Sequence, residues 1–169
     1  WGRIDGLVNN AGIVGYKQRV EDMDVSRLEE MMRVNVIGTM LCAREAVKRM
    51  STSNGGHGGV IVNLSSVAAK LGSPNEFVDY AASKGAVDSF TKGLALEVAD
   101  DGIRVNAVRP GIIDTEIHAS SGQPDRIERM RDKLPLKREG KADEVAEVVL
   151  FLLSDASSYV TGTLVDVAG

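Results

Sequence analysis

Residues 59–66 read GVIVNLSS, and this short stretch decides the fold class. Its valine, isoleucine and leucine residues would place apolar side chains on both faces of a strand. A strand that is apolar on both faces is typical of a parallel sheet with helices packed on each side. Ser65 and Ser66 mark the expected end of this strand. The stretch therefore predicts the centre of a layered α/β domain.

Strand and helix patterns alternate on either side of this stretch. Short apolar runs bounded by glycine or proline indicate strands, and apolar residues at helical spacing indicate helices. The resulting order, in which strands and helices take turns, favours one α/β domain with a parallel sheet and helical crossovers. The expected strands are 5–11, 59–66, 103–111 and 162–168, and the expected helices are 26–50, 79–99, 124–133 and 143–153.

The expected helix over 26–50 has two unusual features. Ser26 and Glu29 have the spacing of a capping box, which predicts that the helix begins there. Asn35 and Gly38 stand in its interior, where each costs up to ~1 kcal/mol relative to alanine, so we expect a kink. Cys42 lies among apolar residues of the same helix and is expected to be a small core side chain.

Composition excludes several classes of function. The chain has 169 residues with 20 Lys+Arg and 24 Asp+Glu, giving a net charge of -4. No basic stripe is present, so neither nucleic acid nor a membrane is an expected partner. One cysteine and two histidines, His57 and His118, offer no disulfide framework and no metal site. The absence of a signal peptide or a long apolar run favours the cytoplasm.

Polar or conformationally special residues follow three of the expected strands. They are found in Asn9-Asn10-Ala11-Gly12, in Ser65-Ser66 and in Pro110-Gly111. Ligands of parallel sheets bind beyond the carboxyl ends of the strands, and these ends meet at one edge. The sequence therefore predicts a binding site at this edge.

The stretch YAASK (80–84) opens the expected helix over 79–99 and reaches the same edge. Tyr80 and Lys84 are four residues apart, so they lie on one face of a helix. A free tyrosine titrates near ~10, but a nearby ammonium and a helix N-terminus both favour the phenolate. We therefore expect a lowered pKa that would make Tyr80 a general acid or base. The alternative is an ordinary surface pair.

Taken in order, these motifs resemble the short-chain dehydrogenase/reductase family over essentially the whole chain. The loop before Tyr80 and the stretch TEIHAS (115–120) also resemble bacterial members that act on sugars, other alcohols or unknown substrates. The resemblance implies a Rossmann-like, doubly wound sheet in one NAD(P)-binding domain, residues 1–169. The motifs that carry it are NNAG (9–12), VNVIG (34–38), NLSS (63–66), YAASK (80–84), RVNAVRPG (104–111) and YVTGTLVDVAG (159–169).

The resemblance also implies a role for each catalytic residue. Tyr80 would exchange a proton with a carbonyl or alcohol oxygen while a hydride moves to or from the nicotinamide. Lys84 would lower the tyrosine pKa and hydrogen-bond the nicotinamide ribose. Ser66 would donate a hydrogen bond to the substrate oxygen, although Ser65 remains an alternative. Asn35 would free a backbone carbonyl for a water that links Lys84 to solvent.

For the cofactor, NAD or NADP, the resemblance implies a larger set of contacts. Asn10 would lie beside the adenine ribose, while Ile113 and Thr115 would line the nicotinamide amide. The implied cofactor-binding residues are Asn10, Ala11, Gly12, Tyr80, Lys84, Pro110, Gly111, Ile113 and Thr115.

Compared with the family pattern, the sequence lacks the glycine-rich nucleotide-binding turn and the residue that chooses between NAD and NADP. The resemblance thus implies a fold that is incomplete at the N-terminus, with its first three strands missing. We expect a hydride-transferring oxidoreductase acting on a small-molecule carbonyl or alcohol, assembled as a homodimer or homotetramer. The alternative is a catalytically inactive module that only associates with itself or with a partner.

Overall fold

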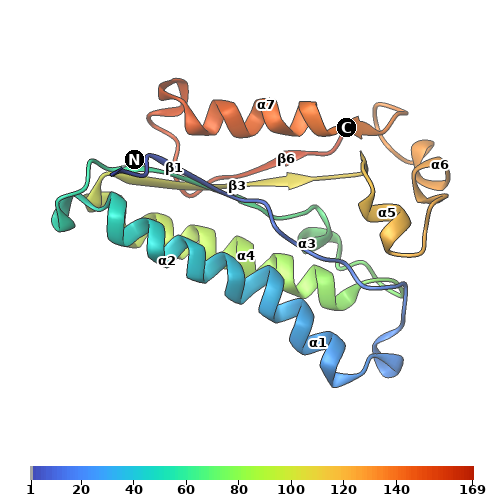
Figure 1. Ribbon diagram of the computed structural model, residues 1–169. Coiled ribbons are helices and arrows are strands. Elements are labelled where there is room, and N and C mark those ends of the chain that lie inside the picture. Colours follow the sequence, from blue (N-terminus) through green and yellow to red (C-terminus); the bar gives the residue numbers. More distant parts are fainter. Residues whose placement is uncertain (1) are drawn as a thin grey trace.

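The computed structural model describes residues 2–169, which form helices packed on both faces of a four-stranded sheet (Figure 1). All neighbouring strands are parallel and follow the order β1-β2-β3-β6. Helices α2 and α4 cover one face and α7 covers the other. The predicted α/β fold with a parallel sheet is confirmed. The strands of this sheet are β1 (Gly6–Asn9), β2 (Gly59–Leu64), β3 (Ile103–Pro110) and β6 (Leu164–Val167).

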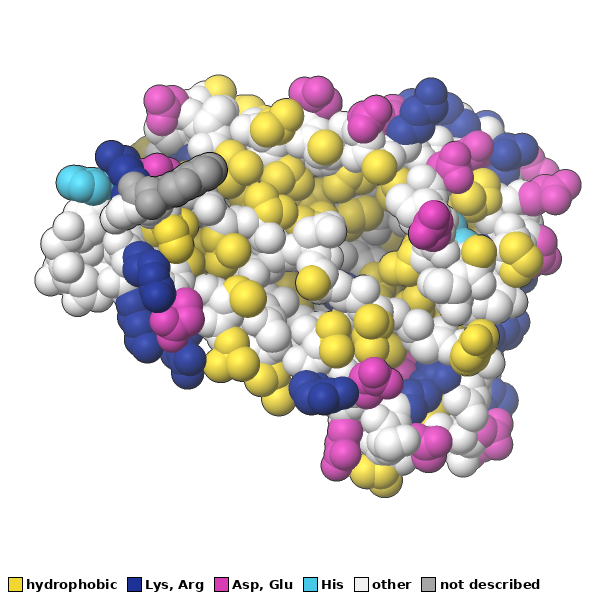
Figure 2. Space-filling model, viewed as in Figure 1, with side chains coloured by type: hydrophobic (Ala, Val, Ile, Leu, Met, Phe, Trp, Pro, Cys, Tyr) yellow, Lys and Arg dark blue, Asp and Glu magenta, His cyan; other side chains and the backbone are white. Residues whose placement is uncertain are grey.

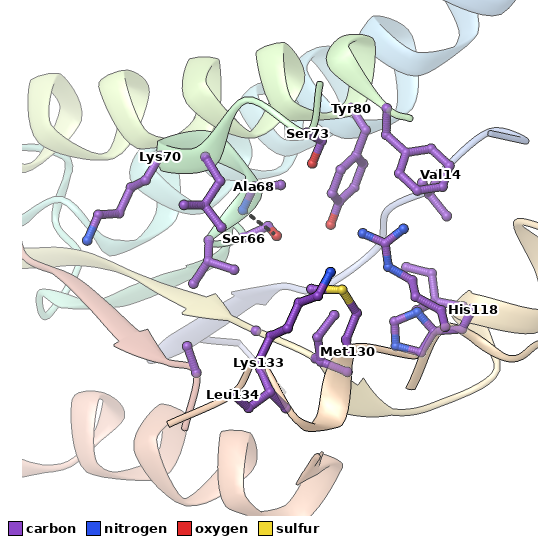
Figure 3. Close-up of a pocket in the computed structure, with 18 of the residues that line it drawn as sticks. Val14, Ser66, Ala68, Lys70, Ser73, Tyr80, His118, Met130, Lys133 and Leu134 are labelled. Atoms are coloured by element: carbon purple, nitrogen blue, oxygen red, sulfur yellow. Dashed lines mark hydrogen bonds between the residues drawn. The ribbon is translucent and has the colours of Figure 1, made fainter. Parts of the chain in front are cut away.

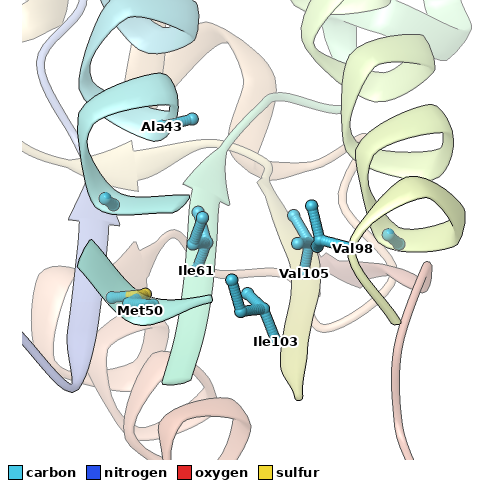
Figure 4. Packing of buried hydrophobic residues seen from close by; sticks show 8 residues of the cluster. Ala43, Met50, Ile61, Val98, Ile103 and Val105 are labelled. Carbon is cyan, nitrogen blue, oxygen red and sulfur yellow. The ribbon is translucent and has the colours of Figure 1, made fainter. Parts of the chain in front are cut away.

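Strand β2 is buried on both faces, as its apolar sequence predicts. Ile61 belongs to a core cluster with residues of α2 and α4 (Figure 4), whereas its neighbour Val62 packs toward α7. Both side chains are fully buried. Since each buried side chain of this size contributes about 1.5–3 kcal/mol, β2 holds the two helical layers together. The main helices are α1 (Val25–Met32), α2 (Thr39–Met50), α4 (Val78–Glu97) and α7 (Ala142–Leu153).

A six-residue π-helical segment, Arg33–Gly38, joins α1 to α2. Asn35 and Gly38, where the sequence predicts a kink, both lie in this segment. The helix is therefore interrupted there by a local widening of the turn, as is typical of short π-helical segments within α-helices. The helix starts differently from the capping-box prediction. Asp24 is the N-cap, and its carboxylate accepts hydrogen bonds from the Arg27 amide at 2.8 Å and the Ser26 hydroxyl at 2.7 Å.

Cys42 is exposed on α2, so its expected place in the core is wrong. The side of α2 that faces the sheet is formed by other residues, among them Ala43 and Ala46, which are buried. Cys42 precedes Ala43 by one position and is rotated by about 100° away from the core side.

The segment between β3 and α7 has more structure than the sequence predicts. Ile113–Asp114 (β4) pairs in parallel with Gly140–Lys141 (β5), forming a second small sheet. Two short helices lie between these strands, where the sequence predicts one helix near 124–133. The remaining short elements are α3 (Ala68–Leu71), α5 (Ile117–Ser120) and α6 (Arg126–Arg131), with 3₁₀ turns at Val20–Asp22, Thr52–Asn54, Ala99–Asp101 and Asp155–Ser157.

Strand β1 lies at the edge of the sheet and pairs only with β2 within residues 2–169. Ile4 and Val8 are about two-fifths exposed there, and Leu150 and Phe151 are exposed on α7. Figure 2 shows apolar side chains along the hollow beneath α7, on the side of β1. Among the described helices, none is long and apolar enough to cross a membrane.

Candidate active site

Two cavities meet where β2 ends and α4 begins. The larger has a volume of about 420 Å³ and the smaller about 250 Å³. Ser66, at the end of β2, and Tyr80, in the first turn of α4, line both of them. Lys84, one turn after Tyr80, lines the smaller cavity. The sheet edge predicted from the sequence thus brings the three side chains to one place (Figure 3 shows the larger cavity).

Lys84 is buried at the base of the smaller cavity. Its ammonium donates a hydrogen bond to the Leu64 carbonyl at 2.7 Å and lies 5.7 Å from the centroid of the Tyr80 ring. Burial lowers the pKa of Lys84 to about 8, although the charge of Asp88 acts in the opposite direction. A Cβ atom on Gly12 would come within 3.2 Å of this ammonium, so glycine leaves the room that Lys84 occupies.

The expected lowering of the Tyr80 pKa is wrong. Burial raises the pKa above its usual value, outweighing the hydroxyl of Ser66 and the charge of Arg126, which both lower it. Lys84 has little effect on the Tyr80 pKa, because its ammonium is hydrogen-bonded to the Leu64 carbonyl and lies over the face of the Tyr80 ring. At neutral pH the site therefore holds Tyr80 as a neutral phenol, which is the proton-donating form.

Asn35 is fully buried in the π-helical segment and fastens the loop that follows β1. Its side chain accepts a hydrogen bond from the Ile13 amide at 2.8 Å and donates to the Ile13 carbonyl at 3.0 Å. It also donates to the Ser83 hydroxyl at 3.0 Å, on the same helix as Lys84. The Asn35 carbonyl accepts a hydrogen bond from the Thr39 hydroxyl at 2.9 Å and has a second lone pair that can accept another.

The two serines after β2 have different surroundings. The Ser65 hydroxyl is buried and donates to the Lys84 carbonyl at 3.2 Å, so it braces α4. The Ser66 hydroxyl accepts a hydrogen bond from the Ala68 amide at 3.1 Å and can still donate its own proton. Only Ser66 lines both cavities. The geometry favours Ser66 over Ser65 as the residue that contacts a substrate oxygen.

Nearly all residues that the family resemblance implies for cofactor binding line the smaller cavity. Ala11 is the exception, since it is exposed and does not line this cavity. The assigned residues that do line it are Asn10, Gly12, Tyr80, Lys84, Pro110, Gly111, Ile113 and Thr115.

Sequence reasoning missed the side chains that shape the larger cavity. Arg126 and Lys133 come from the irregular segment after β3, and Phe77 from the loop before α4. His118 lies between the cavities, and burial lowers its pKa despite its hydrogen bond to the Ile113 carbonyl. No signal in the local sequence points to a binding role, because basic and acidic residues are nearly balanced in the segment between β3 and α7. No cluster of three potential metal ligands occurs within residues 2–169.

Comparison with known proteins agrees with this geometry. A family model described as enoyl-(acyl carrier protein) reductase matches residues 1–169. An uncharacterized oxidoreductase of Escherichia coli, YgfF, is 58% identical over 166 residues, which is 98% of this chain and 67% of the relative. The chain belongs to the short-chain dehydrogenase/reductase family.

Solved structures of this family superimpose on most of the chain. A structure described as ElxO with NADP bound has a TM-score of 0.88 and 34% identity, covering 100% of this chain and 67% of that one. A 3-oxoacyl-[acyl-carrier protein] reductase from Brucella melitensis has a TM-score of 0.89 and 40% identity, covering 98% and 62%. The short-chain dehydrogenase/reductase chain described here thus spans about two thirds of the length of these relatives.

Proposed function

We propose that the intact protein transfers a hydride between NAD or NADP and a small-molecule alcohol or carbonyl compound. The observation that carries the proposal is the position of Ser66 and Tyr80 in the wall between two cavities. The carbonyl carbon that gains the hydride is bonded to the oxygen that gains the proton, so the proton donor has to lie where the two reactants meet. The comparisons give no support to the alternative of a non-catalytic, self-associating module, since the relatives reported above are named as oxidoreductases or reductases.

The residues around the shared wall supply acid catalysis and charge stabilisation. In the reductive direction the Tyr80 hydroxyl gives its proton to the carbonyl oxygen, and its raised pKa keeps that proton available. The Ser66 hydroxyl donates a hydrogen bond to the same oxygen as negative charge develops on it. The Lys84 ammonium, beside the ring, then stabilises the phenolate that remains.

The smaller cavity fits the nicotinamide end of the cofactor. Gly12 lets the chain approach Lys84 closely, and Asn10 and Thr115 offer polar groups at the rim. Lys84 would hold the nicotinamide ribose, and Ile113 would lie against the amide. When bound, the nicotinamide supplies the hydride for reduction or accepts it for oxidation. We assign residues 1–169 to a single NAD(P)-binding domain on this basis.

Replacement of Tyr80 by phenylalanine tests the proposal. In the intact protein, Tyr80→Phe keeps the ring and removes the proton donor, so kcat should fall by at least a hundredfold while NAD(P)H affinity changes less than threefold. Ser66→Ala should cost about 2.7–4 kcal/mol of transition-state stabilisation, as for the loss of one oxyanion donor.

Ser65→Ala is the matched control for the serine assignment, since it removes the adjacent hydroxyl that braces Lys84. Steady-state kinetics with both cofactors measures all three variants. Retained turnover in Tyr80→Phe would exclude Tyr80 as the proton donor. A larger loss in Ser65→Ala than in Ser66→Ala would move the oxygen contact to Ser65.

A further inference from the structure

The larger cavity is apolar over most of its wall but carries positive charge that the fold leaves unbalanced. Besides Tyr80 and His118, four charged side chains line it: Lys70, Arg126 and Lys133 are basic and Asp166 is acidic. Lys70 and Asp166 neutralise one another through a salt bridge of 2.7 Å. The charges left to act on a bound molecule are those of Arg126 and Lys133.

Arg126 is held in place with part of its guanidinium unused. Its Nη1 donates to the Glu76 carboxylate at 2.7 Å, and the guanidinium carbon lies 5.0 Å from the centroid of the Phe77 ring. Within residues 2–169, Nε and Nη2 have no hydrogen-bond acceptor. These two atoms form the side-on edge of the guanidinium, whose parallel N–H groups match the two oxygens of a carboxylate.

The charge of Arg126 reaches the site where chemistry is proposed. It lowers the pKa values of both Tyr80 and His118, so it acts within electrostatic range of each. Glu76 does not cancel it completely, because Lys17 shares that carboxylate at 3.6 Å. Lys133 follows α6 by two residues, its amine is directed into the cavity (Figure 3), and it has no ion-pair partner within residues 2–169.

We propose that the larger cavity selects carbonyl or alcohol substrates that carry a carboxylate on an apolar body, with Arg126 and Lys133 as the specificity residues. This inference rests on the proposed oxidoreductase function. In the reductive direction the substrate carbonyl carbon gains a hydride from NAD(P)H and its oxygen gains the Tyr80 proton, giving the alcohol and NAD(P)⁺. The carboxylate stays unchanged and serves only for binding. A cavity of about 420 Å³ is in the size range of small-molecule sites.

Two aldehydes that differ by the charge of one group and a methyl group test the proposal in the intact protein. The substrates are 4-formylbenzoate and its methyl ester, reduced with NADPH and with NADH at pH 7.5. We expect kcat/KM to favour the carboxylate at least tenfold, mainly through KM. Arg126→Met should remove most of this preference by lowering the carboxylate value more than the ester value. Equal kcat/KM values for the two substrates in the unmodified protein would overturn the proposal.

Three further variants separate charge recognition from damage to the fold. Arg129→Met removes an arginine from the same helix that does not line the cavity, and it should leave the preference intact. Arg126→Lys keeps a charge beside Glu76 and should retain part of the preference. Lys133 is exposed, so Lys133→Glu should fold normally and reduce the carboxylate preference at least tenfold. An unchanged preference in both Arg126→Met and Lys133→Glu would overturn the proposal.

A binding measurement distinguishes failure of this inference from failure of the proposed function. Calorimetry compares 4-(hydroxymethyl)benzoate with its methyl ester, and we expect at least tenfold tighter binding of the carboxylate. Turnover of both aldehydes without any charge preference would overturn the substrate class and leave the oxidoreductase function standing. Arg126-dependent carboxylate binding without turnover would support the anion site and overturn the oxidoreductase function.

Discussion

Tyr80 and Lys84 show how burial can outweigh both a helix dipole and a neighbouring charge. Tyr80 lies in the first turn of α4, where the dipole favours the phenolate, and an ammonium lies 5.7 Å from its ring centroid. Burial nevertheless raises the tyrosine pKa and lowers the lysine pKa to about 8. Both groups are therefore pushed toward their neutral forms.

The lowered pKa of Lys84 predicts how stability depends on pH. Since the folded pKa of about 8 lies below the ordinary lysine pKa of 10.5, the unfolded chain binds more protons between these values. Stability should then rise with pH across that window, whereas below pH 8 the cost of the buried charge is constant. Between pH 7.5 and 9.5 the gain should be about 2 kcal/mol, at 1.36 kcal/mol per pKa unit.

Urea denaturation across this pH range measures the Lys84 effect, with Lys84→Met as the comparison. In the methionine variant, the rise in the free energy of unfolding between pH 7.5 and 9.5 should be smaller by about 2 kcal/mol, because the titrating group is gone. Lys92→Met is a matched control, since Lys92 is an exposed lysine on the same helix and should leave the slope unchanged. Parallel curves for the unmodified protein and Lys84→Met would show that Lys84 titrates as an ordinary lysine.

At the scale of elements, the π-helical segment predicts a structural role for Asn35. Its side chain makes both hydrogen bonds to Ile13, so Asn35→Ala leaves a partly buried amide and carbonyl without partners. At about 1–3 kcal/mol for each of the two unsatisfied groups, the free energy of unfolding should fall by about 2–6 kcal/mol. The loop that carries Gly12 should also loosen, since Asn35 fastens it to α4 through Ser83.

Hydrogen exchange of the Ile13 amide, together with the urea midpoint, measures this effect. Asn54→Ala is a suitable control, because Asn54 is exposed and its side chain makes no hydrogen bond within the described residues. A loss below 0.5 kcal/mol with unchanged exchange at Ile13 would show that the π-helical segment holds the loop by packing alone.

The sequence predicts the long elements of the fold well and the short ones poorly. Strand β2 and helix α4 begin and end within two residues of their predicted limits, because burial of whole faces leaves a strong pattern. The two-residue pair of β4 and β5 leaves no such pattern, since it depends on contacts between segments far apart in the chain. The start of α1 was misplaced because Asp24, Ser26 and Glu29 are all good capping residues and only geometry chooses among them.

The same limit applies to the candidate site. Ser66, Tyr80 and Lys84 follow from motifs on long elements, and the structure brings them together. Arg126 and Lys133 belong to the irregular segment, so nothing in their local sequence indicates that they face a cavity. The sequence could not predict that the Tyr80 pKa is raised, because the shift depends on burial, and the spacing of residues along a helix does not determine burial.

At the scale of the whole molecule, the outer face of α1 and α2 predicts self-association. Met32, Ile37, Met40 and Leu41 are all at least 39% exposed there. Leu96, on α4, is also exposed, whereas Met31 on α1 and Val87 on α4 are buried in the core. A contiguous apolar face of this kind usually marks a protein interface, so we expect a homodimer or homotetramer.

Light scattering of the intact protein at micromolar concentration measures its assembly. Leu41→Glu places a charge on the apolar face and should shift the protein toward the monomer. Leu136→Glu is the control, because Leu136 is similarly exposed but lies outside these helices. A stable monomer in the unmodified protein would contradict the prediction.

Cofactor affinity is the last property that depends on the molecule as a whole. In Rossmann-type folds, dinucleotide affinity comes largely from a glycine-rich strand-to-helix turn that holds the pyrophosphate at a helix N-terminus. No such turn occurs in residues 1–169, and the smaller cavity offers contacts only of the kind that suits a nicotinamide and its ribose. A few contacts must then offset the entropy of fixing a flexible cofactor. We expect residues 1–169 alone to bind NADPH with a Kd of about 1 mM or weaker, or about -4 kcal/mol.

Fluorescence titration of NADH and NADPH against residues 1–169, beside the intact protein, measures this affinity. The intact protein should bind at least a hundredfold more tightly, and the short chain should show little or no turnover. Among the cofactor contacts, Lys84→Ala in the intact protein should remove only the one to the ribose, so it should weaken cofactor binding far less than use of the shorter chain does. Micromolar binding with turnover by residues 1–169 would instead place the main affinity determinants in the smaller cavity, around Gly12, Lys84 and Thr115.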